Sequence, residues 1–86
     1  MDFEFDSNKS HLNKEKHGID FAEGQLLWED PDYIEIPARV VGEPRFLVIG
    51  KIHSKHYSAV ITYRKDKIRI ISIRRSQHKE IEIYES

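Results

Sequence analysis

The sequence has no cysteine and only three prolines and four glycines among its 86 residues. The lack of cysteine excludes a disulfide framework, a thiolate zinc site and a cysteine nucleophile. Proline and glycine are too scarce to build a linker and no repeat is visible, so we expect a single domain over residues 1–86. No apolar run approaches the roughly 18 residues that span a bilayer, and the start does not resemble a signal peptide. We therefore expect a cytoplasmic protein with no membrane contact.

Common catalytic and phosphate-binding motifs are also missing. The sequence has no glycine-rich phosphate loop, serine nucleophile elbow, HExxH zinc motif or calcium loop. His53 and His56 have a spacing that could bind a metal, but they span a predicted hairpin turn with no carboxylate or thiol nearby. A solvated turn is the favoured interpretation, and we expect neither a metal nor another cofactor.

Charge is present in quantity but is unevenly distributed. Residues 1–37 contain ten acids and three bases, a net charge of −7, whereas residues 51–79 contain nine bases and one acid, a net charge of +8. A basic block that also carries tyrosine and histidine is typical of a phosphate-binding surface. Solvated strand edges are often rich in lysine too, so charge alone leaves both interpretations open.

The periodicity of apolar residues predicts an α+β fold. A short strand around Phe3–Phe5 precedes a helix that starts at Asp6 or Ser7 and ends at Gly18, and Asp20 begins a second helix that stops at Asp30. Four further strands are expected at Tyr33–Ile36, Arg45–Ile52, Tyr57–Arg64 and Lys67–Arg75, the last three as an antiparallel meander.

The last strand and the C-terminal segment leave more room for interpretation. Strict alternation would place Ile68, Ile70, Ser72 and Arg74 on one face of the last strand and Arg69, Ile71, Ile73 and Arg75 on the other, so both faces would be partly apolar. We expect one face to meet the helices and the other a partner. The final segment alternates like a strand, but the spacing of Ile81 and Tyr84, with a cap at Ser76, favours a helix.

RNA cleavage needs little machinery, because the 2′-hydroxyl supplies the nucleophile. A base, an acid and cations around the phosphate suffice, and histidine suits proton transfer near neutral pH. The candidates are His17 and His78 for proton transfer, Arg64 and Arg74 for phosphate, Glu80 as an arginine partner or base, and Tyr84 for stacking or proton donation. Each has a structural alternative. Lys14, Lys16 and His17 could simply stabilise the end of the first helix, and Glu80 could simply pair with Arg74 or Arg75.

Arg64 and Arg74 end two antiparallel strands, so they are predicted at opposite ends of the sheet. A sheet of this size is only about 20 to 25 Å long, so one RNA strand could track across both ends. The arginines then predict an extended groove rather than one compact cluster.

The chain carries specific blocks at a specific mutual spacing. They are Lys16-His17-Gly18-Ile19-Asp20-Phe21, Trp28-x-Asp30-Pro31, Arg45-Phe46-x-x-Ile49-Gly50, Tyr63-Arg64, Ile68-Arg69-Ile70-Ile71-Ser72-x-Arg74-Arg75, Lys79-Glu80 and Tyr84. In these blocks the chain resembles, over nearly its full length, the BrnT family of type II toxins. It departs from the family at Lys65, which stands in a turn where the family often has glycine, and at Ile73 and Ser76, which replace alanines.

The resemblance implies a RelE-like α+β fold, with an antiparallel sheet of about four strands, two N-terminal helices and a short C-terminal helix. It also implies ribonuclease activity that arrests translation, and a BrnA-type antitoxin whose ribbon-helix-helix domain alone would contact DNA. Carried over by position, the family's functional pattern falls on Lys16, His17, Arg64, Arg74, Glu80 and Tyr84. Neighbouring cations are expected to bind RNA, namely Lys14, Lys16, Arg69, Arg75 and Lys79.

The leading hypothesis is therefore a metal-independent endoribonuclease toxin that a protein antitoxin neutralises. The alternative is a non-catalytic RNA-binding or scaffold subunit of a DNA-bound repressor complex, since both functions fit the charge distribution. Because the core is small, we expect a symmetric toxin-antitoxin oligomer, with antitoxin contact on the sheet face that includes Ile71 and Ile73 and on the arginine-rich groove.

Overall fold

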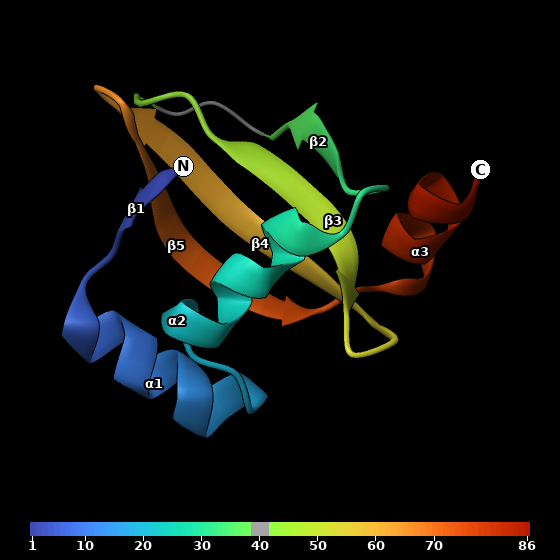
Figure 1. Cartoon of the computed structure of the whole chain (residues 1–86), viewed down its shortest axis with the longest axis horizontal. Helices are drawn as coiled ribbons and strands as arrows, with labels where there is room; N and C mark the ends of the chain where they lie inside the picture. Colours follow the sequence, from blue (N-terminus) through green and yellow to red (C-terminus); the bar gives the residue numbers. More distant parts are fainter. Residues whose placement is uncertain (39–41) are drawn as a thin grey trace.

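The protein is described by a computed structural model that covers residues 1–38 and 42–86. In these segments five strands form one sheet in the order β1-β5-β4-β3-β2 (Figure 1). The strands are β1 (Asp2–Glu4), β2 (Ile34–Pro37), β3 (Phe46–Ile52), β4 (Lys55–Arg64) and β5 (Lys67–Arg75). The antiparallel meander of β3, β4 and β5 is confirmed.

The sheet is larger than the four or so strands that the resemblance implied. β2 joins antiparallel to β3, and β1 pairs in parallel with the first part of β5. The fifth strand arises because the N-terminal residues cover backbone groups of β5 that would otherwise form a free edge. The α+β class itself is confirmed.

Helix α1 (Ser7–His17) has the predicted bounds because both ends are capped. The Asp6 carboxylate accepts the backbone N–H of Lys9 at 3.0 Å. Gly18 ends the helix at φ 78°, in the left-handed region that favours glycine. The sequence therefore determines this helix locally, although it offers few apolar residues for docking.

Helix α1 is attached to the sheet largely through polar contacts. The Asn13 amide donates to the carbonyl of Ile73 at 2.8 Å and accepts the N–H of Ile73 at 3.3 Å. The side chain of Asn13 thus takes the place of a neighbouring strand along β5. Ser10 accepts the N–H of Phe21 at 2.9 Å, which holds the start of the next helix against α1.

The second helix is shorter than predicted. The segment forms one α-helical turn, α2 (Phe21–Gly24), and continues as a 3-10 helix, η1 (Gln25–Glu29). The Asp20 cap is as predicted. The tighter helix accompanies close packing on β3 at Gly50, where an added Cβ would lie 3.1 Å from Leu27 and 3.2 Å from Asp30. Tertiary packing thus overrides the helical periodicity of the sequence.

A bulge in β5 changes which of its residues share a face. Val60 of β4 lies opposite Ser72, but the next residue, Ile61, lies opposite Ile70, so Ile71 is left without a partner. One unpaired residue inverts the alternation beyond it. Three β5 residues therefore share the core face, namely Ile68, Ile70 and Ile73. The predicted assignment of Ile73 to a partner-binding face is wrong, since Ile73 is completely buried.

Helices α1 and α2 cover the core face of the sheet, and α3 (His78–Glu85) lies at the far end of the molecule (Figure 1). The predicted choice of a helix over a strand for this segment is confirmed. Its cap is Gln77 rather than Ser76, because the Gln77 N–H donates to the Glu80 carboxylate at 2.8 Å in a capping box. In the described segments, no helix has the length and apolar character needed to cross a bilayer.

Candidate functional site

The sheet surface opposite α1 and α2, here called the open face, gathers most of the basic residues of β4 and β5. Because of the bulge at Ile71, this face carries Ser58, Val60, Thr62 and Arg64 from β4 and Lys67, Arg69, Ser72 and Arg74 from β5. Three arginines that the sequence assigned to catalysis or RNA binding thus share one surface. Strict alternation had placed Arg69 and Arg74 on opposite faces.

Each arginine of the open face is paired with a glutamate in the structure. The three pairs and their shortest separations are Arg64–Glu43 at 3.1 Å, Arg69–Glu4 at 3.0 Å and Arg74–Glu80 at 2.8 Å. Arg74 lies opposite Ser58, six residues before Arg64 along β4, so the outer two pairs are about 20 Å apart at about 3.3 Å per residue. The predicted placement at opposite ends of the sheet is confirmed.

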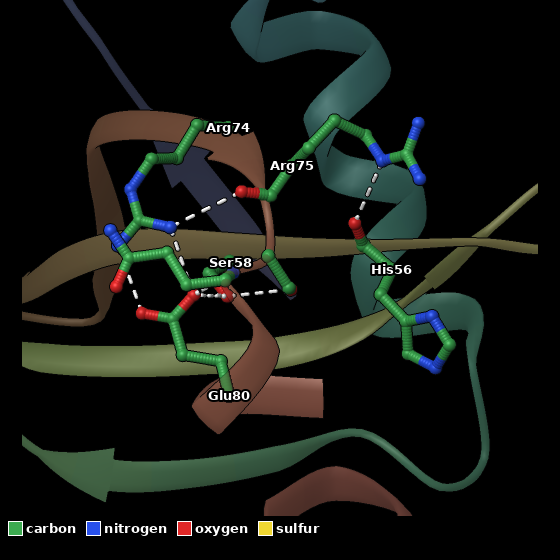
Figure 2. Close-up of polar contacts among 7 residues, drawn as sticks. His56, Ser58, Arg74, Arg75 and Glu80 are labelled. Carbon is green, nitrogen blue, oxygen red and sulfur yellow. Dashed lines mark hydrogen bonds and ion pairs between the residues drawn. The ribbon is translucent and has the colours of Figure 1, made fainter. Parts of the chain in front are cut away.

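The Arg74–Glu80 pair is the most highly connected group on the open face (Figure 2). Arg74 donates to both carboxylate oxygens of Glu80, at 2.8 and 2.9 Å, and to the carbonyl of Arg75 at 3.2 Å. Glu80 Oε1 also accepts the Ser58 hydroxyl and the Gln77 N–H, both at 2.8 Å. The alternative in which Glu80 pairs with Arg74 is thus confirmed.

These contacts fix the charge of Glu80. Its hydrogen bonds from Arg74 first, and then from Gln77 and Ser58, outweigh burial and lower the pKa of Glu80 to about 2. The same pairing raises the pKa of Arg74. Glu80 is therefore ionised at neutral pH, with its acceptor sites occupied. It is well placed to orient Arg74 and poorly suited to accept a proton.

Tyr84 is held away from the Arg74–Glu80 pair. Its hydroxyl donates to Asp30 Oδ2 at 2.6 Å, and the same carboxylate oxygen accepts the N–H of Lys51 at 2.8 Å. The hydrogen bond to Asp30 raises the pKa of Tyr84 well above its usual range. Burial alone would raise the pKa of Asp30, but the hydrogen bonds from Tyr84 and from backbone N–H groups lower it. Tyr84 is therefore neutral and anchored to Asp30, the residue that follows η1.

The cations at the end of α1 lie outside the open face. Lys16 and His17 line a cavity of about 230 Å³ at the edge of β5, together with Ile71 and Ser72. Ser72 is two residues, or about 7 Å, from Arg74 along the strand. Lys14 stabilises the end of α1, as the structural alternative proposed: its ammonium donates to the carbonyl of Gly18 at 3.3 Å.

Arg75 and Lys79 complete the predicted set. Arg75 lies opposite Tyr57 in the sheet, with its guanidinium carbon 5.7 Å from the centre of that ring, and therefore points to the side opposite Arg74. Its Nε donates to the carbonyl of His56 at 3.3 Å. Lys79 is exposed in the first turn of α3, next to Glu80. The structure thus divides the predicted residues among the open face, the edge of β5 and α3.

Two polar residues near the start of β4 were left out of the site predicted from the sequence, although His56 had been considered as a metal ligand. Ser58 is buried and donates to Glu80, and His56 is half-buried beside Glu85. The prediction of a solvated turn holds for the exposed His53, but His56 lies on β4. His56 and Ser58 alternate with Tyr57 and Ala59, and this alternation was the feature of the sequence that could have placed both on one face of β4. In residues 1–38 and 42–86, no three His, Asp or Glu side chains gather as a metal site would require.

Comparison with protein families finds that residues 5–80 match the family described as "Ribonuclease toxin, BrnT, of type II toxin-antitoxin system". Comparison with curated proteins finds no significant match. The family match extends from Phe5, directly after β1, to Glu80, and so includes all three arginines of the open face.

Proposed function

The chain belongs to the BrnT family of ribonuclease toxins of type II toxin-antitoxin systems, and from this premise we propose that it is a metal-independent endoribonuclease that binds RNA along the open face. Membership of a type II system implies a protein antitoxin as partner. The proposal treats residues 1–86 as one toxin domain with a RelE-like fold and assigns translation arrest to RNA cleavage.

The alignment of Arg64, Lys67, Arg69 and Arg74 on one face is the observation that supports this proposal. A row of cations about 20 Å long suits a single-stranded polyanion, whose phosphates are bound mainly by lysine and arginine. RNA would follow β5, with Arg74 at the catalytic end and Arg64 and Arg69 along the strand. Lys16, Lys79 and Arg75 would contact flanking phosphates from neighbouring surfaces.

The chemistry requires one proton to leave the 2′-hydroxyl and one to reach the departing 5′ oxygen. The new bond joins O2′ to phosphorus, the P–O5′ bond breaks, and a 2′,3′-cyclic phosphate and a 5′-hydroxyl remain. Arg74 would stabilise the charge on the phosphorane, because its planar guanidinium is already oriented by Glu80. Glu80 would act as a positioning residue, and Tyr84 could stack on a base. The proton-transfer role of His17 stays a prediction.

The test uses the purified full-length chain, a structured RNA and an excess of chelator. We expect fragments that end in 2′,3′-cyclic phosphate, and an Arg74→Lys variant that stays folded but cleaves at least about tenfold more slowly, since lysine lacks the bidentate fork. Cleavage that stops with chelator would contradict metal independence. RNA binding without cleavage would instead favour the non-catalytic RNA-binding or scaffold function.

We further propose that the antitoxin is of the BrnA type, with a ribbon-helix-helix domain, and that it covers the open face in a symmetric oligomer. The predicted contact through Ile73 is excluded by its burial. The open face instead offers half-buried Ile36, Leu47 and Val60, which lie opposite one another on adjacent strands. Hydrogen exchange on the purified complex tests this. We expect protection on β4 and β5, and protection confined to α1 and α2 would contradict it.

A further inference from the structure

The proposed reaction needs a proton acceptor that the Arg74–Glu80 pair does not supply. Glu80 is ionised but occupied by four hydrogen bonds, and the Tyr84 hydroxyl is bound to Asp30. In residues 1–38 and 42–86 the His17 side chain makes no hydrogen bond or ion pair, so no polar partner orients its ring at the edge of β5. A better candidate for the proton acceptor lies on β4, on the other side of Arg74 from His17.

His56 occupies the end of the open face, two residues before Ser58 on β4. Residues two apart on a strand share a face, so His56 and Ser58 both point toward α3. Ser58 contacts Glu80, and one helical turn later Tyr84 and Glu85 contact His56. One turn of α3 thus spans about the same distance as two residues of β4. His56 lies about 7 Å along the strand from Ser58, which contacts the Arg74–Glu80 pair.

The His56 ring is oriented by a carboxylate. Its Nε2 lies 2.7 Å from Glu85 Oε2, and the ring packs edge-to-face on Tyr84 with centroids 5.3 Å apart. Since an ionised carboxylate only accepts hydrogen bonds, the Nε2 atom carries a proton, and in the neutral ring Nδ1 then carries the lone pair. The charged groups that face the ring are Glu85 from α3 and Lys51 from β3, whereas Arg75 from β5 donates to the backbone carbonyl of His56 from the other face of the sheet.

Cations surround the same end of the sheet. Arg75 donates its Nε to the carbonyl of His56, next to Arg74, as Figure 2 shows. Lys51 lies directly opposite His56 on β3. Because Arg75 points to the opposite side of the sheet, a phosphate held by Arg74 on the open face would lie beside a histidine that a carboxylate already orients. This is the arrangement of base and orienting group that recurs in acid-base catalysis.

We propose that His56 is the general base of the RNA cleavage reaction and that Glu85 is its positioning residue. The inference rests on the proposed function and names the group that takes the proton. His56 Nδ1 accepts the proton of the 2′-hydroxyl as O2′ bonds to phosphorus, the P–O5′ bond breaks, and the 5′ oxygen takes a proton from water. The second cation-lined edge, at His17, then serves RNA binding rather than proton transfer.

The experiment measures kcat and KM for RNA cleavage by the full chain between pH 5 and 8. Four variants are compared with the wild type: His56→Gln, Glu85→Gln, His17→Ala, and His53→Gln as the matched control. Glutamine at position 56 can still donate to Glu85, so the strand–helix contact is retained, and thermal unfolding checks the fold. His53 lies in the adjacent turn and is exposed, so the same substitution there leaves the cleavage rate unchanged.

We expect His56→Gln to lower kcat by about 10²- to 10⁴-fold, the range for positioned acid-base groups, and to remove the fall in rate at acidic pH. Glu85→Gln should lower kcat about tenfold with KM unchanged, because it disturbs the orientation of the ring and not RNA binding. If His56→Gln cleaves like the wild type, or if His17→Ala alone removes the acidic limb, the assignment of His56 is overturned while the ribonuclease proposal stands. A wild-type chain that cleaves no RNA overturns both.

Discussion

The two ends of the open face carry the same kind of ion pair in different surroundings. Arg64 and Glu43 form an exposed pair at one end, with N–O distances of 3.1 and 3.3 Å. Arg74 and Glu80 form a half-buried pair at the other end, with both N–O distances below 3 Å. Glu80 also accepts hydrogen bonds from Ser58 and Gln77. The same two residue types thus make an exposed surface contact in one place and a half-buried, highly connected contact in the other.

The difference indicates separate tasks for the two arginines. An exposed pair contributes little to stability and can exchange its carboxylate for a phosphate at small cost. A half-buried pair fixed by a helix cap keeps a guanidinium in one orientation, which is what stabilisation of a transition state requires. Arg64 therefore suits binding of the RNA backbone, and Arg74 suits catalysis.

The largest expected difference between the two ends is in stability. Glu80→Ala leaves Arg74 half-buried without its carboxylate and removes the partner of Ser58, so it should lower the free energy of unfolding by about 2 to 3 kcal/mol. Glu43→Ala should leave it nearly unchanged, because an exposed ion pair contributes little to stability. Urea denaturation of both variants measures the difference. Equal losses would remove the structural contrast between the two ends.

The second expected difference is in catalysis. Arg74→Lys should reduce kcat by about ten- to a hundredfold, because lysine keeps the charge but loses the bidentate geometry. Arg64→Lys should leave kcat unchanged and raise KM only about two- to threefold, since a charge suffices for binding phosphate. Steady-state cleavage assays on both variants separate the two parameters. A larger loss of kcat for Arg64→Lys would reverse the assignment of the catalytic end.

A smaller difference is expected in the response to acid. The pKa of Glu80 is lowered from an ordinary value of 4.5 to about 2 in the folded chain, mainly by the hydrogen bond from Arg74. Its stabilising effect is therefore complete above about pH 4.5 and is lost as the pH falls toward about 2. The stability advantage of wild type over Glu80→Gln should shrink across this window. The advantage over Glu43→Gln should be small throughout, and acid titration of all three proteins checks both statements.

The smallest expected effect concerns competition at Arg64. The hydrogen bond from Arg64 lowers the pKa of Glu43, so the carboxylate is ionised and competes with RNA phosphate. Glu43→Gln should raise RNA affinity about two- to threefold at low salt, and the gain should fade at high salt, where exposed charges are screened. Binding measured at two salt concentrations tests this. An affinity that falls in the variant would show that Glu43 helps to position Arg64.

The sequence by itself determined most of the local structure of this protein. Asp6, Asp20 and Gly18 mark helix ends that depend on a side chain or a dihedral angle of a single residue, and all three caps were predicted. The meander followed from alternating apolar residues and short turns, one of which holds Lys65 at φ 56°. The family was also recognisable, because blocks of residues at fixed spacing need no tertiary information.

The tertiary structure alone decided which residues form the site. The bulge at Ile71 is set by pairing with β4 and shifts every later side chain of β5 to the other face, so alternation in the sequence assigned Arg74 and Ile73 wrongly. The contacts that join Ser58 to Glu80 and His56 to Glu85 cross 22 and 29 residues of sequence. They depend on where α3 packs against β4, and packing between distant segments leaves no local pattern in either one.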